Sequence, residues 1–417
     1  MVYNVDGVRI DAQADVTEVN NMVGAFYENG VFDYEIGRLG VQDSTWSWWT
    51  RPICEHFVGV RDRVYYGYTT HDGFAGVGMY DPKTGIFQKT HLKKNEQDDH
   101  NAAAVLPRTD RKILVAYPSG HNVSNKMFVR LSKYTEDITE WNDPVELTCS
   151  PSVSYAQLLY VNSKYWLFYR STNYNWIYRT SSDGVTWSDE RFLVTAAQQY
   201  YVLAVPTNDS SRIRFCCTAN PQYSDTNIRM GFIDTSTEAV YNADNSTVVR
   251  AGTAAKTSGI TNTNFTTIIA APGSGSQRLF DVRRGTAPGS VYILYATYST
   301  NTDSAYYIYN NGTTTKLCDG GAALWNPKYQ LGATFVGSDK IVVARNSSGS
   351  DIIEIVDYSG TLGETLHTEA NGTLPIRNAR PVASSDGDVV MWQRGYYNSS
   401  VYTDFDMDAY IEILTNA

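Results

Sequence analysis

The feature that most constrains the fold of this chain is a coarse repeat of strand-rich segments. Apolar and aromatic runs separated by turn residues recur at roughly 40 to 55 residues, the spacing at which four-stranded propeller blades repeat. Seven such segments can be drawn, at about 52–95, 100–148, 153–195, 199–249, 262–320, 327–366 and 378–416. The repeat predicts an all-β fold, a seven-bladed β-propeller.

The amino-acid composition favours a single β unit. Tyrosine (31), glycine (31) and tryptophan (9) are abundant, and only 19% of the 417 residues are charged. Such residues favour strands and tight turns over long helices. We therefore assign residues 50–417 to one propeller domain. Residues 1–49 are less regular, with a short helix expected at 16–26, and we interpret them as an N-terminal strap or attachment segment.

One segment carries a sharper marker of the fold. The residues from Ser181 to Trp187 fit the pattern S-x-D-G-x-T-W, known as an Asp box. In this pattern Asp183 and Gly184 form a hairpin turn, and the tryptophan packs between strands. The motif indicates a blade and does not itself indicate catalysis.

Charge and hydropathy exclude some partners. The formal net charge is −10 and the pI is about 5.1, which argues against nucleic acid, because binding phosphates needs a basic face. No stretch of 18 apolar residues exists, so we expect no membrane insertion. An anionic substrate is compatible with this charge if arginine and histidine are concentrated in one cleft, because net charge does not report the sign of a pocket.

The cysteines and the start of the chain say little about function. The five cysteines, at 54, 149, 216, 217 and 318, show no C-x-x-C spacing. An odd number is poor evidence for a disulfide framework, so we expect mostly buried thiols. The first residues have neither a basic nor an apolar signal region, so no secretion signal is expected in this sequence.

Two of the six histidines lie at the heads of neighbouring predicted strands. His100 stands in a D-D-H-N motif, and His121 follows 21 residues later in a G-H motif. The apolar runs at 102–106 and 112–117, with a turn between them, predict a hairpin. Because hairpin partners are antiparallel, both imidazoles should meet at one edge of the sheet and act on one ligand. Taken singly, each histidine could instead be a solvated or capping residue.

The next predicted blade adds two polar partners. Residues 154–160 and 165–170 form a second predicted hairpin, with Tyr155 and Arg170 at its open end. Consecutive blades pack side by side, so these side chains should join the two histidines on one face. An arginine that closes an apolar strand suits recognition of a carboxylate by its planar guanidinium. The alternative is that Tyr155 is a sheet aromatic and Arg170 a surface ion-pair partner.

Taken together, these motifs resemble a known family. The sequence runs D-D-H-N-A-A-A, then Y-P-S-G-H-N, S-Y-A-Q-L, W-L-F-Y-R and W-I-Y-R-T-S-S-D-G-V-T-W. It resembles the BNR-4 type seven-bladed propellers, and more specifically the ulvan lyases of polysaccharide lyase families 24 and 25. The resemblance covers roughly residues 50–416 and is most specific over 98–187. The closing segment at 379–396 also resembles the last blade of this group.

The resemblance implies a set of site residues. The two histidines, the tyrosine and the arginine of the family site fall on His100, His121, Tyr155 and Arg170. A further tyrosine from the next blade would be Tyr200 or Tyr201, and the motifs do not choose between them. We also expect Asn101 and Trp176 among the substrate-binding residues.

The implied reaction is cleavage of a uronate-containing polysaccharide by β-elimination, which leaves a 4,5-unsaturated uronate end. Arg170 and a protonated or donating His121 would neutralise the substrate carboxylate. His100 would take the C5 proton, with its tautomer fixed by Asp98 or Asp99. Tyr155, or the tyrosine at 200 or 201, would protonate the leaving oxygen. A scheme in which one tyrosine serves as both base and acid is equally consistent with the sequence.

Other functions compete with this one. A carbohydrate-binding propeller without catalysis, such as a phage receptor-binding domain, would need aromatic platforms but not His100 together with Tyr155. A sialidase-like hydrolase would need three arginines around a carboxylate, and only Arg51, Arg170 and Arg283 could be nominated. A zinc or copper enzyme could use the two histidines, but a third ligand at a recognisable spacing is missing.

The expected partners and location follow from this interpretation. We expect an anionic uronate-containing polysaccharide as the partner, no cofactor required for catalysis and no catalytic metal, while a structural metal and the oligomeric state are left open. The expected location is extracellular or virion-associated, the latter because the chain is rich in Asn, Thr and Tyr and poor in Lys.

Overall fold

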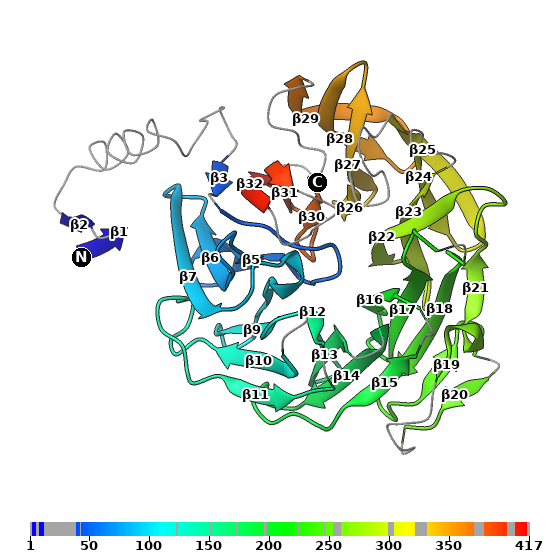
Figure 1. Ribbon diagram of the computed structural model, residues 1–417, viewed down its shortest axis with the longest axis horizontal. Coiled ribbons are helices and arrows are strands. Elements are labelled where there is room, and N and C mark those ends of the chain that lie inside the picture. The colour runs from blue at the N-terminus through cyan, green and yellow to red at the C-terminus, as the bar shows by residue number, and fades with distance from the viewer. Residues whose placement is uncertain are drawn as a thin grey trace.

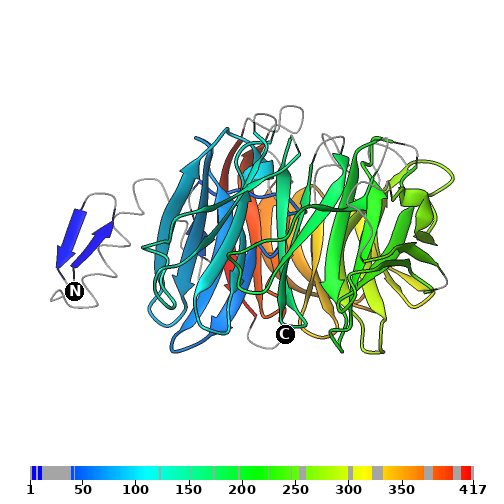
Figure 2. The same cartoon turned by 90° about the horizontal axis from the view of Figure 1, so that it is seen from below.

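Seven β-sheets stand in a ring around a central axis, which confirms the predicted seven-bladed β-propeller (Figures 1 and 2). The computed structural model describes residues 2–5, 8–11, 39–41 and 43–414 except for some short segments. These segments are 122–123, 151, 172–173, 196–197, 224, 246, 253–259, 299–303, 322–331, 371–378 and 398–404.

Helical structure in the described residues is limited to 3-10 turns, namely η1 (Asp99–Asn101), η3 (Asn262–Asn264) and a turn that includes Tyr174. None of the described helical turns has the length and apolar character needed to cross a membrane. The helix predicted at 16–26 lies outside the described residues.

The first three blades are four-stranded antiparallel sheets. Blade 1 holds β4 (Cys54–Val58), β5 (Asp62–Thr69), β6 (Phe74–Asp81) and β7 (Ile86–Lys94). Blade 2 holds β8 (Ala104–Pro107), β9 (Ile113–Pro118), β10 (Lys126–Leu131) and β11 (Val145–Thr148). Blade 3 holds β12 (Ser154–Val161), β13 (Lys164–Arg170), β14 (Trp176–Ser181) and β15 (Arg191–Val194).

Blade 4 is larger, and blades 5 and 6 return to four strands. Blade 4 holds β16 (Tyr200–Pro206), β17 (Arg212–Ala219), β18 (Ile228–Asp234), β19 (Val240–Asn242), β20 (Val248–Arg250) and β21 (Thr266–Ile269). Blade 5 holds β22 (Ser276–Arg284), β23 (Val291–Tyr298), β24 (Ser304–Asn310) and β25 (Thr313–Gly321). Blade 6 holds β26 (Gly332–Val336), β27 (Lys340–Ser347), β28 (Ser350–Asp357) and β29 (Leu362–Ala370). The blades follow the predicted segments to within a few residues, except that β21 joins blade 4.

Blade 7 combines the two ends of the chain. It holds β30 (Val382–Ala383), β31 (Val389–Tyr397), β32 (Phe405–Ile413) and, at its outer edge, β3 (Leu39–Val41). β3 runs antiparallel to β32, with Leu39 opposite Ile411. The ring is thus closed by hydrogen bonds between sequence-distant strands. β1 (Val2–Val5) and β2 (Val8–Asp11) pair only with each other among the described residues.

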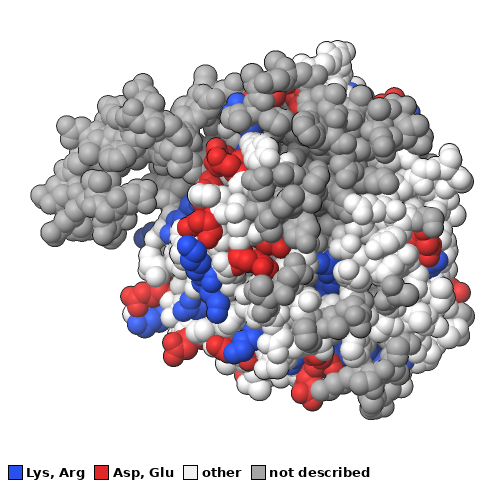
Figure 3. Space-filling model, in the orientation of Figure 1, with Lys and Arg blue, Asp and Glu red and all other residues white. Residues whose placement is uncertain are grey.

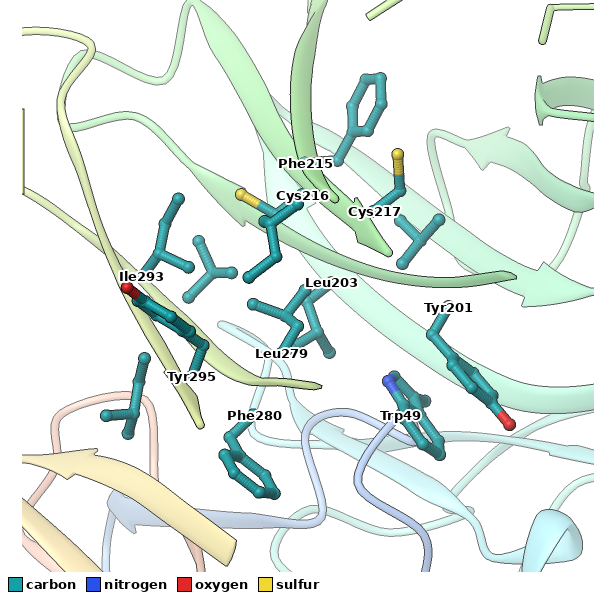
Figure 4. Close-up of a cluster of buried hydrophobic side chains, with 14 of the residues drawn as sticks. Trp49, Tyr201, Leu203, Phe215, Cys216, Cys217, Leu279, Phe280, Ile293 and Tyr295 are labelled. Carbon is teal, nitrogen blue, oxygen red and sulfur yellow. The ribbon is translucent and has the colours of Figure 1, made fainter. Parts of the chain in front are cut away.

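Burial follows the position of a strand within its blade. β13 is buried at every position after its first residue, whereas the outer strand β7 has no buried position. Inner strands are covered on both faces by neighbouring blades, so most of their residues are buried and apolar. Figure 4 shows this packing between blades 4 and 5, where Leu203 meets Leu279 and Ile293.

The cysteines are part of this core. Cys216 and Cys217 are fully buried neighbours on β17, and their sulfur atoms point to different sides of the strand (Figure 4). All five cysteines are free thiols, four of them buried. The expectation of mostly buried thiols is confirmed.

A central segment, residues 44–50, crosses the middle of the ring (Figure 1), and each of its residues is at most 2% exposed. Its hydrogen bonds, with those of the adjoining Arg51, reach four different blades or their connections. They join Thr45 to Thr69 (2.9 Å), Trp46 to the Arg380 carbonyl (3.0 Å), the Trp49 carbonyl to Gln157 (3.0 Å), and Arg51 to the Phe280 carbonyl (2.9 Å). The predicted 1–49 segment therefore contributes residues 39–41 and 44–49 to the propeller itself.

The antiparallel order of the strands within each blade brings the same strand ends together at one end of the propeller. In each blade the innermost strand begins at the same end of the sheet at which the second strand finishes. We call this end of the propeller the top face. It carries the connections between blades, together with the turns between the second and third strands.

Polar contacts between β4 of blade 1 and the β30–β31 turn of blade 7 form a seam between these two blades. His56 on β4 lies between two carboxylates, with Nδ1 contacting Asp388 and Nε2 lying 2.6 Å from Asp62 Oδ1. The neighbouring Glu55 accepts hydrogen bonds from the backbone and hydroxyl of Ser385 in the β30–β31 turn. Burial raises the pKa of Glu55 to about 7. Burial lowers the pKa of His56, but hydrogen bonds to Asp388 and Asp62 outweigh it and raise the pKa overall.

We expect this seam to lose stability as the pH rises. The folded protein disfavours ionised Glu55. The resulting loss of folding free energy begins as the pH passes the ordinary pKa of 4.5 and is complete above about pH 7. The His56 contribution is full below 6.5 and is lost as the pH passes its raised pKa. Thermal unfolding of wild type and Glu55→Gln should diverge between about pH 5 and pH 8, with wild type losing on the order of 2 kcal/mol more. Identical pH dependence in the two proteins would contradict this role for Glu55.

Candidate active site

Five polar side chains from the first three blades meet on the top face. Asp98 and His100 lie in the connection between blades 1 and 2, and His121 follows the end of β9. Tyr155 is the second residue of β12, and Arg170 is the last residue of β13. The structure therefore brings together the four residues that the sequence predicts as catalytic.

The turn η1 presents His100. Asp98 caps this turn by accepting a hydrogen bond from the backbone N–H of His100 at 2.8 Å. Asn101 is fully buried, and its side-chain amide donates to the carbonyl of Glu96 at 3.2 Å. Asn101 thus stabilises the turn from inside. The expectation that it contacts substrate stays a prediction.

The carboxylate of Asp98 bridges the two histidines. Its Oδ1 atom contacts Nδ1 of His100, and its Oδ2 atom lies 2.9 Å from Nδ1 of His121. The two imidazoles stack with their centroids 3.8 Å apart and an interplanar angle of 13°. Asp98 is fully buried, so its charge must be balanced by these partners.

The network defines the state of His121. Nη2 of Arg170 lies 3.0 Å from Nε2 of His121. A guanidinium can only donate, so Nε2 must accept and the ring proton must sit on Nδ1, facing Asp98. Burial and the charge of His100 lower the pKa of His121 to about 4, although the Asp98 hydrogen bond opposes this. His121 is therefore neutral near pH 7.

His100 has the opposite electrostatic balance. Burial lowers its pKa, but the charges of Asp98 and Asp99 and the hydrogen bonds to them outweigh burial and raise the pKa overall. Burial also acts to raise the pKa of Asp98, yet its interactions with His100 and His121 prevail and lower it. The stacked rings thus differ in proton affinity, with His100 the more basic of the two.

A second carboxylate, Asp99, ties His100 to blade 7. Asp99 Oδ1 lies 2.9 Å from Nδ1 of His100, while Oδ2 contacts Arg380 and accepts a 2.8 Å hydrogen bond from the Tyr397 hydroxyl. Burial opposes ionisation of Asp99, but the charges of Arg380 and His100 hold its pKa well below the ordinary value.

The sequence analysis did not place Arg380 and Tyr397 in the site. A positional signal for both existed. Arg380 precedes the first strand of blade 7, and Tyr397 ends the second, as Arg170 ends the second strand of blade 3. Antiparallel order alone would put all of them on the top face.

Tyr155 occupies a β-bulge. Ser154 pairs with Arg170 and Ala156 with Tyr169, which leaves Tyr155 as the extra residue, with φ of 55°. A left-handed backbone costs a non-glycine residue roughly 1 to 3 kcal/mol and is found mainly at functional sites. The bulge aims the phenol ring at His100, with centroids 4.7 Å apart. Burial raises the pKa of Tyr155 well above 10, so its hydroxyl keeps its proton.

Two aromatic side chains hold Tyr155 in place. Trp49 of the central segment packs at 5.6 Å, and Trp176 lies parallel to the phenol ring at 6.2 Å. Trp176 is fully buried, and its indole N–H donates to the carbonyl of Tyr200 at 2.9 Å. Trp176 thus supports the ring of Tyr155, and its expected contact with substrate stays a prediction.

Arg170 is a buried cation with spare donors. Its Nε atom donates to the Ser154 hydroxyl at 3.0 Å, and its guanidinium carbon lies 4.6 Å from the centroid of the Tyr155 ring. Its Nη1 atom has no hydrogen-bond partner among the described residues. Nη1 is thus a buried donor without a described partner, which an anion such as a carboxylate would satisfy.

The structure separates Tyr200 from Tyr201. The Tyr200 hydroxyl points to a polar cluster in blade 4, where it donates to Asp225 at 3.2 Å. The ring of Tyr201 stacks on Trp49 at 3.5 Å and lies edge-on to Tyr155 at 6.1 Å. Successive strand residues face opposite ways, so only Tyr201 adjoins the cluster.

The cluster does not suit a shared metal ion. Ligand atoms of Asp98, His100 and His121 lie within 4.8 Å of one another, so Asp98 is the third ligand that sequence spacing did not reveal. However, an imidazole nitrogen binds a metal ion through its lone pair, which lies in the plane of the ring. The rings of His100 and His121 are stacked nearly parallel at 3.8 Å, so one ion cannot lie in both ring planes. A second group, Asp43, His71 and Asp72, is largely exposed, and nothing else there indicates an ion.

The surface around the site is not generally basic. Figure 3 shows the top face, where acidic and basic side chains are mixed over blades 1 to 3 and uncharged atoms prevail over blades 4 and 5. The coloured part of this face in Figure 3 shows no continuous basic patch, whereas Arg170 and Arg380 are buried cations inside the site.

Comparison with known proteins supports the fold. No protein-family model and no curated protein matches the sequence. Among solved structures, the chain is similar to a polysaccharide lyase of a new family, the PL25 ulvan lyase, at 14% identity and a TM-score of 0.67, covering 93% of this chain and 96% of that one.

Two further solved structures show the same architecture. One is a PL25 ulvan lyase bound to -[GlcA(1-4)Rha3S]- (13% identity, TM-score 0.65, coverage 91% and 95%). The other is the BP39L lectin from Burkholderia pseudomallei (10% identity, TM-score 0.57, coverage 87% and 96%). At these identities the likeness establishes the propeller fold.

The two stacked histidines should titrate far apart. His121 should gain a second proton only near pH 4, whereas His100 should titrate above its ordinary value of 6.5. NMR of the ring signals would measure both, with His100→Gln and His121→Gln used to assign them. Two histidines that titrate together near the ordinary value would overturn the assigned network.

Proposed function

We propose that the protein is a polysaccharide lyase that cleaves an ulvan-like, uronate-containing polysaccharide by β-elimination. The observation that carries this proposal is a buried arginine with spare donors beside a basic histidine and a protonated tyrosine. Removal of the proton α to a carboxylate needs these three groups together. The fold that the chain shares with a PL25 ulvan lyase supports it.

Arg170 would bind the uronate carboxylate. The carboxylate gains negative charge as the C5 proton leaves, so a fixed cation at this position stabilises the transition state more than the bound substrate. His121 would not donate to the substrate, because its Nδ1–H faces Asp98 and its Nε2 accepts from Arg170. We assign it to positioning Arg170.

His100 would act as the base. Asp98 and Asp99 both lie at its Nδ1, so Nε2 is the atom that would take the C5 proton. The electron pair of the broken C–H bond would form the C4–C5 double bond as the bond from C4 to the glycosidic oxygen breaks. The raised pKa of His100 makes it a stronger base once it is neutral.

Tyr155 would protonate the departing oxygen. Its high pKa keeps the hydroxyl protonated and ready to donate, and it disfavours the scheme in which the same tyrosine first acts as a base. The proton on His100 would return to the Tyr155 phenolate through water after the product leaves.

The proposal extends to partner and location. The partner would be an anionic polysaccharide, held by Arg170 with Tyr201 and Tyr155 lining the site. Such a substrate is met outside cells, so we propose an extracellular protein, with attachment to a virion as the alternative.

A non-catalytic carbohydrate-binding propeller is the second candidate. The similarity to the BP39L lectin favours it, but simple binding gives no reason for Asp98 to clasp two histidines. A sialidase-like site has less support, because the nominated Arg51 already forms an ion pair with Asp281 at 3.0 Å.

His100→Ala and Tyr155→Phe should each lower kcat by about 10² to 10⁴, the usual contribution of a positioned acid or base. Both residues act in one transition state, so the kcat of the double variant should be scarcely lower than that of the less active single variant. The assay is the ultraviolet absorbance of unsaturated uronate across uronate polysaccharides. Tyr160→Phe, a half-exposed tyrosine at the other end of β12, is the matched control and should stay active.

The binding alternative predicts a different pattern. A wild-type protein that binds a uronate polysaccharide and never forms unsaturated product would refute the lyase proposal. In that case the same variants should alter affinity alone.

Arg170→Lys should lower kcat/KM about tenfold or more, through a lower kcat as well as a higher KM, although its charge is kept. A single ammonium cannot satisfy Ser154, His121 and two carboxylate oxygens at once. The matched control is Arg179→Lys, a buried arginine of the same blade that bonds to Tyr169 and the Thr148 carbonyl. Equal kinetics of Arg170→Lys and wild type would exclude Arg170 as the carboxylate ligand.

A further inference from the structure

The shared carboxylate of Asp98 links two parts of the site that a lyase needs for different purposes. One oxygen contacts His100, the proposed base, and the other contacts His121, which in turn holds Arg170. The result is one continuous hydrogen-bonded chain from Arg170 through His121 and Asp98 to His100. Every member of this chain is at most 8% exposed, so bulk water does not screen it.

We propose that Asp98 is a positioning residue that couples recognition of the substrate carboxylate at Arg170 to the proton affinity of His100, with His121 as the connecting group. This inference rests on the proposed function for its catalytic consequence. The coupling itself is a property of the folded protein and can be measured without substrate.

The stacked histidines share a limited capacity for protons. Two imidazolium rings 3.8 Å apart would repel each other strongly in a buried site. The single carboxylate between them can fully compensate only one positive ring. The pair therefore holds one extra proton, and its location depends on what each ring faces.

Arg170 decides the location of that proton. Nε2 of His121 accepts a hydrogen bond from a permanent cation, so His121 cannot gain a proton there without losing this bond. His100 faces Asp98 and Asp99 at Nδ1 and the ring of Tyr155. Arg170 thus directs the extra proton to His100 through His121.

The two aspartates should have separable effects. Of the two histidines, Asp99 contacts His100 and not His121 among the interactions of the described residues. Its other oxygen contacts Arg380 and Tyr397 of blade 7. Asp98 reaches both histidines. Loss of Asp98 should therefore disturb Arg170 as well as His100, whereas loss of Asp99 should disturb His100 and Arg380 and leave His121 and Arg170 in place. Asp99→Asn is thus a matched control for Asp98→Asn.

The first test is NMR titration of the histidine rings in wild type, Arg170→Met and the control Arg179→Met. In Arg170→Met the midpoint of His121 should rise by about one pH unit or more, and the midpoint of His100 should fall, because the rings then compete for one proton. The control should match wild type. Unchanged midpoints in Arg170→Met would overturn the coupling whether or not the protein is a lyase.

The second test measures unsaturated uronate production against pH. kcat/KM should rise with pH as His100 loses its proton. Asp98→Asn should move this rise to lower pH and raise KM at least severalfold. Asp99→Asn should also move the rise to lower pH, with KM nearly unchanged. An Asp98→Asn variant with the KM and pH profile of Asp99→Asn would contradict the proposed link to Arg170. If Asp98→Asn does not fold, the Arg170→Met titration decides the question. Absence of product from wild type refutes the lyase proposal and leaves the titration result valid.

Discussion

The central segment at 44–50 is the constraint on which both fold and site depend. Its residues are buried in the middle of the ring (Figure 1). Its hydrogen bonds reach blades that are not neighbours in the ring, such as blade 3 and the start of blade 7. The same segment reaches the site directly, because Trp49 stacks on Tyr201 and packs against Tyr155. The strained bulge at Tyr155 is thus held by a rigid aromatic layer, which is how a costly backbone conformation persists.

Buried charge is the second organising principle. Asp98, Asp99, Arg170 and Arg380 are each at most 4% exposed, and an isolated charge in such a place is strongly destabilising. Three of them are matched by opposite charge or by histidine: Asp99 with Arg380, and Asp98 with the two histidines. Arg170 instead contacts Ser154, His121 and the ring of Tyr155. Such networks contribute little net stability. Their value here is that they fix tautomers and orientations before any ligand binds.

Local pattern in the sequence predicted the parts of the site that local hairpins create. The period of strand-rich segments identified the blades, and antiparallel order placed His100, His121, Tyr155 and Arg170 on one face. It could not reveal contacts made across the ring, such as that of Asp99 with Arg380, 281 residues away. Nor could motif position show burial: Asn101 and Trp176 were expected to bind substrate, and both side chains are fully buried in the structure.

The balance of charges explains how an acidic protein could bind and process an anion. The cluster holds two carboxylates, Asp98 and Asp99, and two guanidiniums, Arg170 and Arg380, so it is neutral when both histidines are neutral. A bound uronate would make it negative by one charge. That charge raises the proton affinity of His100 at the moment when the base must act. In the proposed reaction, transfer of the C5 proton to His100 would add a positive ring to the site as the carboxylate gains charge, so a basic surface would not be needed to stabilise the intermediate.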